Sequence, residues 1–523
     1  MKNLINRIIL IVIVMTSFSC SDFLQYDQKG EPTNTTFWKT EVDAQRAADG
    51  LYYFMGEAGI SGRGFMHYYN CSDDVVTGRA QGGTDKMKNF IADFTRDVTQ
   101  NWPIMYRIIR RANEMILNIP KMEISETVKN STLGEAYFMR AWAYLWLAPY
   151  YGDNGENGGI PIVAEDLTME ELDVPRPKTV SENYEYCIAD FERAASMLPY
   201  LDEMSLNDYG RPHKTACWAY MAKAALYNAR YDNAFYKKVI EYSDKVINSN
   251  KHKLHPDFAS LFTAENNYSK EYLFSFASNA ESGSMLPGVM FENKGWGLYN
   301  GWGYFTPTLS LVEAYEEGDK RLPATVMQPG DVFTYLGSEK VYYSSESYSG
   351  MMFSKYCSPF KDYDAVGKSL NPDGDNPTTN LNIPLIRYAE VLLFKAEAMI
   401  WTGANGDEEI NLVRARAGLS PLTNATKADL KRERRCEFAG EFVNRTLDLI
   451  RWGDADVECE KPLYGYKAVP KEGVNEVKSK EDLDIQVVQI WGKRNYDPSV
   501  NHVFPIPENE IAKGENLKQN KGY

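Results

Sequence analysis

The chain has 523 residues, in which 57 Lys and Arg residues stand against 72 Asp and Glu residues, giving a net charge of −15. Such an acidic surface repels phosphate backbones and anionic lipid headgroups, so nucleic acid and charged membrane surfaces are excluded as partners. The length allows several domains, but no Ser/Gly-rich linker divides the chain, and the loop 371–377 is the one candidate boundary.

The N-terminus has the layout of a secretory signal peptide. Lys2 and Arg7 precede an apolar run at residues 8–15, and small residues follow up to Cys20. The run is far shorter than the ~20 residues that span a bilayer. We therefore predict that residues 1–19 are removed and that Cys20 becomes a lipidated first residue. The alternative is cleavage at another small residue, which would leave Cys20 as an ordinary thiol.

The remaining cysteines indicate no disulfide framework. Six are left after Cys20, and they show no CxxC pairing. We predict that most of them are small buried hydrophobic residues.

Helical signals dominate the middle of the chain. Thr40, Thr179 and Thr426 each stand three residues before a carboxylate at the head of an apolar-periodic run, which is the capping-box pattern. Period-two runs are few and short, with candidates at residues 272–277 and 340–343. The chain is predicted to be mainly α.

Some helices repeat one another. The segment from Glu135 to Trp146 matches the segment from Glu390 to Trp401, and a partial third copy lies at residues 223–225. A turn and a second helix follow two of these copies, at residues 233–249 and 408–417. This pattern is typical of tetratricopeptide helix hairpins without their strict period. Coincidence among Ala-rich helices is the alternative.

The charged run at residues 430–437 is interpreted as scaffold. If the helix continued, Glu441 would meet Arg445 at i,i+4 and Asp448 would meet Arg451 at i,i+3, so opposite charges would pair along one face.

These motifs, taken in order, resemble the SusD/RagB family of outer-membrane lipoproteins. The segments that carry the resemblance are 20–24, 36–44, 102–113, 134–144, 151–152, 384–398, 413–418, 433–453, 504–511 and 519–523. They extend over the whole mature chain. One departure is Lys521, where the family usually has Pro. The resemblance implies one SusD-like domain at 20–523, with an N-terminal region at 20–230 and a C-terminal SusD/RagB region at 260–523. It also implies few short strands and long ligand-binding loops around a tetratricopeptide-like scaffold.

The resemblance also implies a function. Members are surface lipoproteins that act as lids over a SusC-like, TonB-dependent transporter and capture glycan for uptake. Some members bind peptide instead, and this RagB-like role is the main alternative. The expected partners are therefore the transporter, an oligosaccharide and the outer membrane, the last only through the lipid anchor.

Enzymatic motifs are weak. His252-x2-His255 lacks the glutamate of a zinc protease helix, and the chain has no G-x-S-x-G elbow or phosphate-binding loop. A pair of carboxylates that hydrolyses a glycoside would be recognised only from their separation in space, so an all-α glycoside hydrolase stays open as a weaker alternative.

A purely structural tetratricopeptide adaptor would not need exposed rings. No cofactor is expected. The acidic loops at 153–156 and 373–376 lack full calcium-loop spacing, so ordinary turns are the preferred interpretation and a structural calcium site is the alternative.

Three patches are candidates for ligand binding, because flat sugar faces pack on aromatic rings. The first is the glycine-flanked stretch 295–305, with Trp296, Tyr299, Trp302 and Tyr304. The second is the polar-aromatic stretch 67–79, with His67, Tyr69, Asp73, Asp74 and Arg79. The third consists of Tyr342, Tyr343 and Tyr348. Aromatic rings are also common at protein interfaces, so the alternative for each patch is that it contacts the transporter and not the ligand. The sequence does not separate a neutral glycan from a peptide as the ligand.

Overall fold

The structure is a computed structural model of the whole chain. It describes residues 37–57, 59–61, 63–77, 84–91, 101–278, 287–293, 296, 301–335, 338–344, 346–357 and 380–523. The signal peptide, Cys20, Arg79, Tyr299 and the acidic loop 373–376 lie outside the described residues, so the predictions about them stay predictions.

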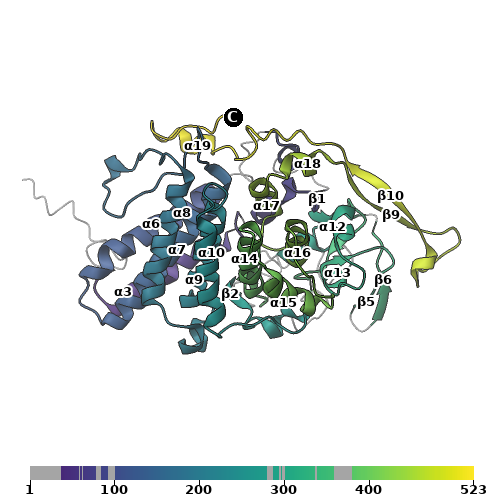
Figure 1. Cartoon of the computed structure of the whole chain (residues 1–523), viewed down its shortest axis with the longest axis horizontal. Coiled ribbons are helices and arrows are strands. Elements are labelled where there is room, and N and C mark those ends of the chain that lie inside the picture. The colour runs from purple at the N-terminus through teal and green to yellow at the C-terminus, as the bar shows by residue number, and fades with distance from the viewer. Residues whose placement is uncertain are drawn as a thin grey trace, which may run out of the picture.

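The N-terminal half is a stack of antiparallel helices (Figure 1). Their bounds are α3 Glu41–Tyr52, α6 Asn101–Asn118, α7 Glu126–Tyr151, α8 Val180–Met197, α9 Lys214–Asn228 and α10 Phe235–Asn248. All three predicted capping boxes are present; at Thr40, for example, the backbone N–H donates to Asp43 Oδ2 at 2.8 Å. Each box satisfies backbone groups that a helix start would otherwise leave unpaired.

The C-terminal half continues the stack through α14, which packs against α10. Its helices are α14 Tyr388–Trp401, α15 Asp407–Ala417, α16 Lys427–Phe438, α17 Arg445–Trp452 and α18 Ala455–Glu460. The helix pairs α9–α10 and α14–α15 fall where the repeats predicted them. Short helices lie in the connections: α4 Thr84–Lys88, α11 Pro287–Phe291, α12 Leu309–Ala314, α13 Arg321–Thr325 and α19 Glu508–Ile511. The prediction of a mainly α fold is confirmed.

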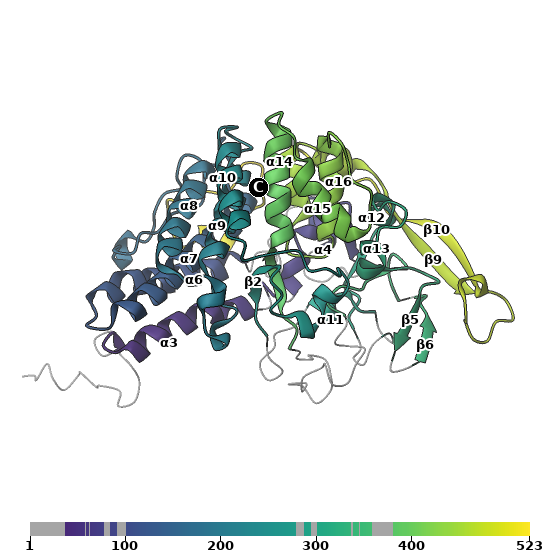
Figure 2. The same cartoon turned by 60° about the horizontal axis from the view of Figure 1, so that its bottom comes forward.

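The strands of the described residues form two-stranded antiparallel pairs. These are β1 Val75–Thr77 with β3 Phe305–Pro307, β2 Tyr272–Phe276 with β8 Ile383–Arg387, β4 Val326–Met327 with β7 Met352–Phe353, β5 Val332–Tyr335 with β6 Ser338–Val341, and β9 Leu463–Pro470 with β10 Leu483–Trp491. Both short strand candidates from the sequence correspond to strands, β2 and β6. Figure 2 shows β5–β6 and β9–β10 together on the side of the molecule away from the N-terminal stack.

One apolar core joins both halves, and a buried ion-pair network crosses it. Arg387 is 1% exposed and contacts Glu437 at 3.0 Å and Glu441 at 2.7 Å. The predicted pair of Asp448 and Arg451 is confirmed at 2.9 Å. The predicted pair of Glu441 and Arg445 is wrong, because α16 ends at Phe438 and the two residues do not share a helix.

None of the helices in the described part of the chain is both long and apolar enough to cross a membrane.

Candidate functional site

The strongest candidate site is a cluster of aromatic rings, which we call the Trp296 platform and define as Trp296, Phe333, Tyr342 and Tyr343. The Trp296 ring centroid lies 4.9 Å from that of Tyr342, 5.5 Å from Phe333 and 6.0 Å from Tyr343. Trp296, Phe333 and Tyr343 are half-buried, so the platform keeps solvent-accessible ring surface. The fold thus joins the first predicted patch to the third.

Tyr342 is the buried member of the platform and holds it against the protein interior. Its ring is fully buried, with Met327 and Met352 in the same apolar cluster. Its hydroxyl accepts a hydrogen bond from Asn293 Nδ2 at 2.6 Å. Its backbone N–H donates to the Asp331 carbonyl at 2.8 Å. Burial raises the pKa of Tyr342 well above its ordinary value, so the hydroxyl stays neutral. A ring that is locked in this way can hold Trp296 in one orientation at little further entropic cost on binding.

The glycine-flanked stretch does not present all its rings. Tyr304 is 2% exposed and lies in the core, which corrects the prediction that it contacts ligand. Gly303 has φ +51°, and a Cβ there would lie 2.5 Å from Asn293 Oδ1. The glycine therefore allows a close backbone approach, and the Tyr304 N–H donates to the Met290 carbonyl at 2.8 Å. Trp302 is half-buried against the main core.

The second predicted patch lies in the interior. The side chains of His67, Tyr69, Asp73 and Asp74 are all buried. The Tyr69 hydroxyl donates to Asp74 Oδ2 at 3.0 Å. These side chains are enclosed in this arrangement, and Tyr69 lines a cavity beside α7 and α9. Their contact with ligand hydroxyls stays a prediction.

The carboxylates of Asp73 and Asp74 form ion pairs with two arginines from the C-terminal half. Asp73 contacts Arg435 at 2.9 Å and Arg445 at 3.1 Å, and Asp74 contacts Arg435 at 2.6 Å. Burial alone would raise the pKa of Asp73, but the two guanidinium groups hold it well below its usual range. These ion pairs join the N-terminal segment to α16 and α17. Their partners are more than 350 residues away in the sequence, so no local pattern indicated them.

The third patch is divided by the fold. Tyr348 is 42% exposed, and its ring lies 6.1 Å from that of Trp491. The Trp491 Nε1 donates to Asn89 Oδ1 at 3.0 Å, so this pair is anchored to the residue that follows α4 and not to the Trp296 platform.

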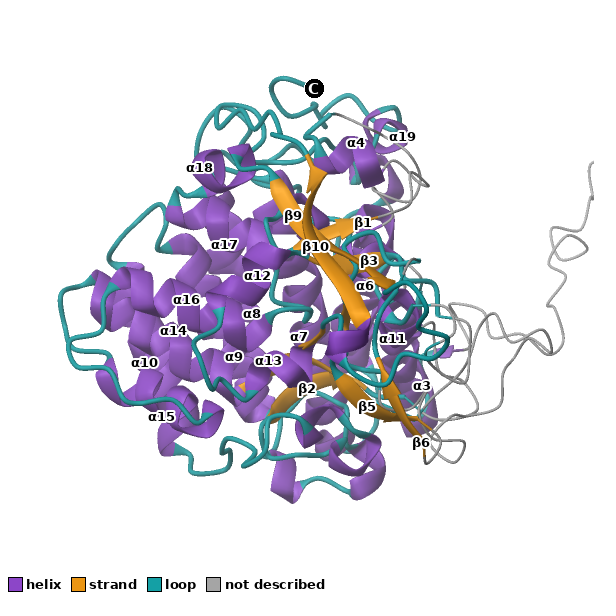
Figure 3. Cartoon of the chain, turned by 90° about the vertical axis from the view of Figure 1, so that its right-hand side faces the viewer, coloured by secondary structure: helices purple, strands orange, loops and turns teal. Residues whose placement is uncertain are grey.

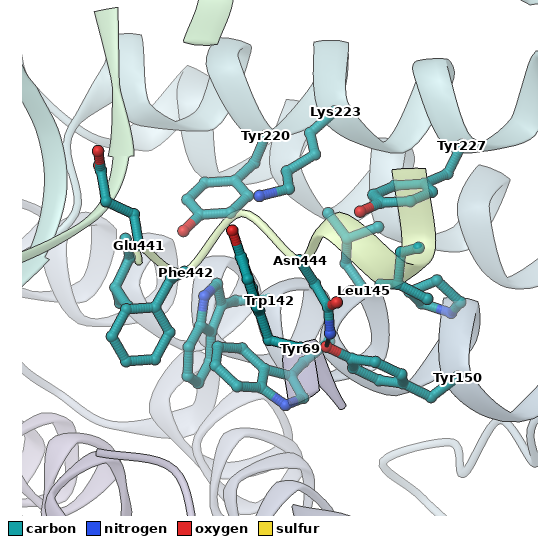
Figure 4. Close-up of a pocket in the computed structure, with 14 residues that line it drawn as sticks. Tyr69, Trp142, Leu145, Tyr150, Tyr220, Lys223, Tyr227, Glu441, Phe442 and Asn444 are labelled. Carbon is teal, nitrogen blue, oxygen red and sulfur yellow. Dashed lines mark hydrogen bonds between the residues drawn. The ribbon is translucent and has the colours of Figure 1, made fainter. Parts of the chain in front are cut away.

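A small cavity lies between α7, α9 and the segment that precedes α17 (Figure 4). Its walls are aromatic, including Trp142, Tyr220 and Phe442, with Lys223 and Glu441 among them. The cavity measures about 60 Å³. Ligand pockets usually measure about 300–1,000 Å³. The cavity is therefore large enough for a few water molecules and too small for a sugar.

A cleft that the sequence did not predict runs alongside helix α6, whose residues form part of its lining. It measures about 580 Å³, and its lining includes Tyr106, Ile109, Arg110, Leu172 and Lys513. Trp102 and Tyr106, which also line the cleft, belong to the segment 102–113 that carries the family resemblance, and no signal in the sequence marked them as cleft residues.

Among the residues that the structure describes, no group of His, Cys, Asp and Glu side chains is arranged to hold a metal ion. Asp153, in one of the two acidic loops, accepts from the Gly155 N–H at 2.7 Å and contacts His502 Nε2 at 2.8 Å. The six cysteines other than Cys20 are buried free thiols, which confirms the prediction that most of them are buried.

The fold is a stack of helix pairs with a partly exposed aromatic platform, and comparison with known proteins identifies its family. The SusD family model matches residues 270–523, and a second model, described as starch-binding associating with outer membrane, matches residues 33–226. "SusD-like protein P2" of Formosa agariphila is 28% identical over 99% of both chains.

Solved structures of SusD-like proteins have the same fold as this chain. A SusD-like protein of Bacteroides fragilis superposes with a TM-score of 0.76 at 23% identity, covering 94% of this chain and 99% of that one. Surface glycan-binding protein A of Bacteroides thetaiotaomicron, solved with laminarihexaose, gives 0.70 at 20% identity, covering 92% and 99%. The chain belongs to the SusD family and has the SusD-like fold.

Proposed function

We propose that this protein is a glycan-binding lipoprotein of the cell surface, which acts as the lid of a SusC-like, TonB-dependent outer-membrane transporter in nutrient uptake. The observation that carries the proposal is the Trp296 platform, since half-buried rings fixed on a rigid base suit the apolar faces of sugar units. The glycan ligand of the Bacteroides thetaiotaomicron protein, which shares the fold, supports it further.

The proposed tether fits this task. A lid that must release its cargo should bind modestly, with a Kd of ~1 mM to ~1 μM. An acyl anchor at Cys20 would keep the protein beside its transporter and raise the effective concentration without new contacts.

The test is titration calorimetry of the mature chain against laminarihexaose, an acidic glycan and a mixed peptide pool. Removal of a stacking ring by Trp296→Ala should weaken glycan binding by about 1–3 kcal/mol, by analogy with base stacking. Tyr53→Ala is the matched control, because Tyr53 is 72% exposed and lies on α3's side of the molecule, away from the platform.

The alternatives give different results. Peptide binding that is indifferent to Trp296→Ala would favour a RagB-like peptide lid. New reducing ends in the glycan pool would indicate a glycoside hydrolase. Glycan binding that Trp296→Ala leaves unchanged would place the site away from the platform.

A further inference from the structure

We propose that the outer edge of β10 is a docking site for an extended segment of a partner polypeptide, which adds to the β9–β10 ribbon as a third strand. This inference does not depend on glycan binding. It follows from the register of the ribbon, the unpaired groups along one edge and a groove on the same face.

The register shows which backbone groups face outward. The Lys471 N–H donates to the Asp482 carbonyl at 2.8 Å, so these two residues form a hydrogen-bonded pair. Hydrogen-bonded and non-hydrogen-bonded pairs alternate along an antiparallel ladder. With Leu483 opposite Pro470, the alternation directs the N–H and C=O groups of Ile485, Val487 and Gln489 away from β9.

The other edge of the ribbon confirms this register. Tyr466 lies opposite Val487, so its backbone groups should also face outward. The Tyr466 N–H indeed donates to the Ser349 carbonyl at 2.8 Å. A Cβ on Gly465 would lie 2.5 Å from the Ser349 carbonyl oxygen, so the segment around Ser349 covers this edge closely.

The β10 edge has no such cover within the described part of the chain. The backbone groups of Ile485, Val487 and Gln489 make no hydrogen bond to any described residue. The strand has nine residues, or about 30 Å of edge. Natural edge strands are usually blocked by charged side chains, proline or short length. The three outward positions here carry none of these, and Figure 3 shows β10 on the side facing the viewer.

A groove borders the same face of the ribbon, and the side chain of Val487 on β10 is among those that line it. It measures about 610 Å³ and lies between the ribbon, where Tyr464 and Val487 line it, and α12, where Leu309 and Glu313 line it. Val487 is 59% exposed and Tyr464 is 40% exposed. In strand addition, backbone hydrogen bonds supply affinity, and pockets for alternate side chains supply specificity.

The groove also indicates the chemistry of the partner. Glu313 is exposed and forms no ion pair with a described Lys or Arg, whereas Glu458 is paired with Lys461 at 2.7 Å. The added strand should therefore carry apolar side chains with one Lys or Arg among the residues that face the groove. A second copy of this chain fits poorly, because two chains of net charge −15 repel each other.

The test uses the full chain and a short blocked peptide in which valine and one lysine alternate with threonine. Amide hydrogen exchange is measured at Ile485, Val487 and Gln489 with and without the peptide. We expect exchange at these amides to slow by about tenfold or more near saturation. The same peptide with every backbone nitrogen methylated should give no protection, because it cannot donate to the edge.

Two variants separate the edge from the fold. Val487→Pro removes an outward N–H and should abolish protection, with the circular dichroism spectrum and melting temperature near those of the parent. Val488→Lys is the matched control, since Val488 is bonded to β9 and its side chain lies on the opposite face. If Val487→Pro unfolds the ribbon, Val487→Lys replaces it, because a charge at that position opposes strand addition.

Two results would overturn the proposal. One is the absence of protection at the three amides, or equal protection by the methylated peptide. The other is a dimer of the peptide-free chain in sedimentation that Val487→Lys dissociates, because the edge would then serve self-association.

Discussion

Replacement of Glu437 by Gln tests whether the buried ion-pair network stabilises the fold through charge. Glu437 is fully buried, and its carboxylate contacts Arg321 at 3.2 Å, Arg387 at 3.0 Å and Arg416. Burial alone would raise its pKa, but the arginines lower the pKa of Glu437 to about 2. Gln keeps the shape of the side chain and removes its charge.

The magnitude follows from the pKa. An unfolded Glu titrates near a pKa of about 4.3, so the folded value lies about 2 units lower and corresponds to about 3 kcal/mol. Removal of one partner from a buried ion pair typically costs about 3–5 kcal/mol, which agrees. Because the folded pKa is depressed, this stabilisation is present above about pH 4.3 and is lost as the pH falls toward about 2.

The assay is urea unfolding of the parent and Glu437→Gln at pH 7 and at about pH 3. The variant should lose about 3 kcal/mol of unfolding free energy at pH 7 and clearly less at the lower pH. Glu126→Gln is the control, because its pairing with Lys129 at 3.2 Å is at the surface and should contribute little. A loss that is the same at both pH values would refute the reasoning, since packing and not charge would then explain it.

Two further predictions concern the scaffold. Burial lowers the pKa of His213 to about 3, so the folded chain cannot take the proton that the unfolded chain binds below about pH 6.5, and stability should fall as the pH drops. His213→Asn keeps a cap for α9 and should recover about 2 kcal/mol of the loss between pH 7 and 5, measured by urea unfolding; an unchanged pH slope would contradict this. Arg176 holds the C-terminal tail through Asn520 Oδ1 at 2.7 Å and the Lys518 carbonyl at 3.2 Å. Arg176→Met should therefore speed carboxypeptidase removal of the tail, whereas equal rates would show that other contacts hold it.

Local chemistry made much of the scaffold predictable. A capping box satisfies its own backbone groups within four residues, so Thr40, Thr179 and Thr426 marked helix starts correctly. The helix pairs α9–α10 and α14–α15 followed from small residues at close-packing positions and from the turns between helices. The family resemblance rested on such local motifs in order along the chain, and the comparisons bear it out.

Ion pairs between residues far apart in the chain could not be predicted from the sequence. Asp73 and Asp74 look like ligand-binding carboxylates in a polar-aromatic stretch, but the fold encloses them against Arg435 and Arg445. The same limit explains the error at Glu441, which pairs across the core with Arg387 and not along one helix. A charged side chain in a linear sequence does not reveal whether its partner is water, ligand or a residue hundreds of positions away.

The sequence alone therefore determined the helical architecture, the family and the glycine-flanked aromatic stretch as a feature to explain. Only the tertiary structure decided that Trp296 joins Phe333, Tyr342 and Tyr343, while Tyr304 enters the core. The physical reason is that helix starts, turns and apolar periodicity are satisfied by neighbours in sequence. Exposure of a ring, the pairing of a buried charge and the free edge of β10 depend on which distant segments the fold brings alongside.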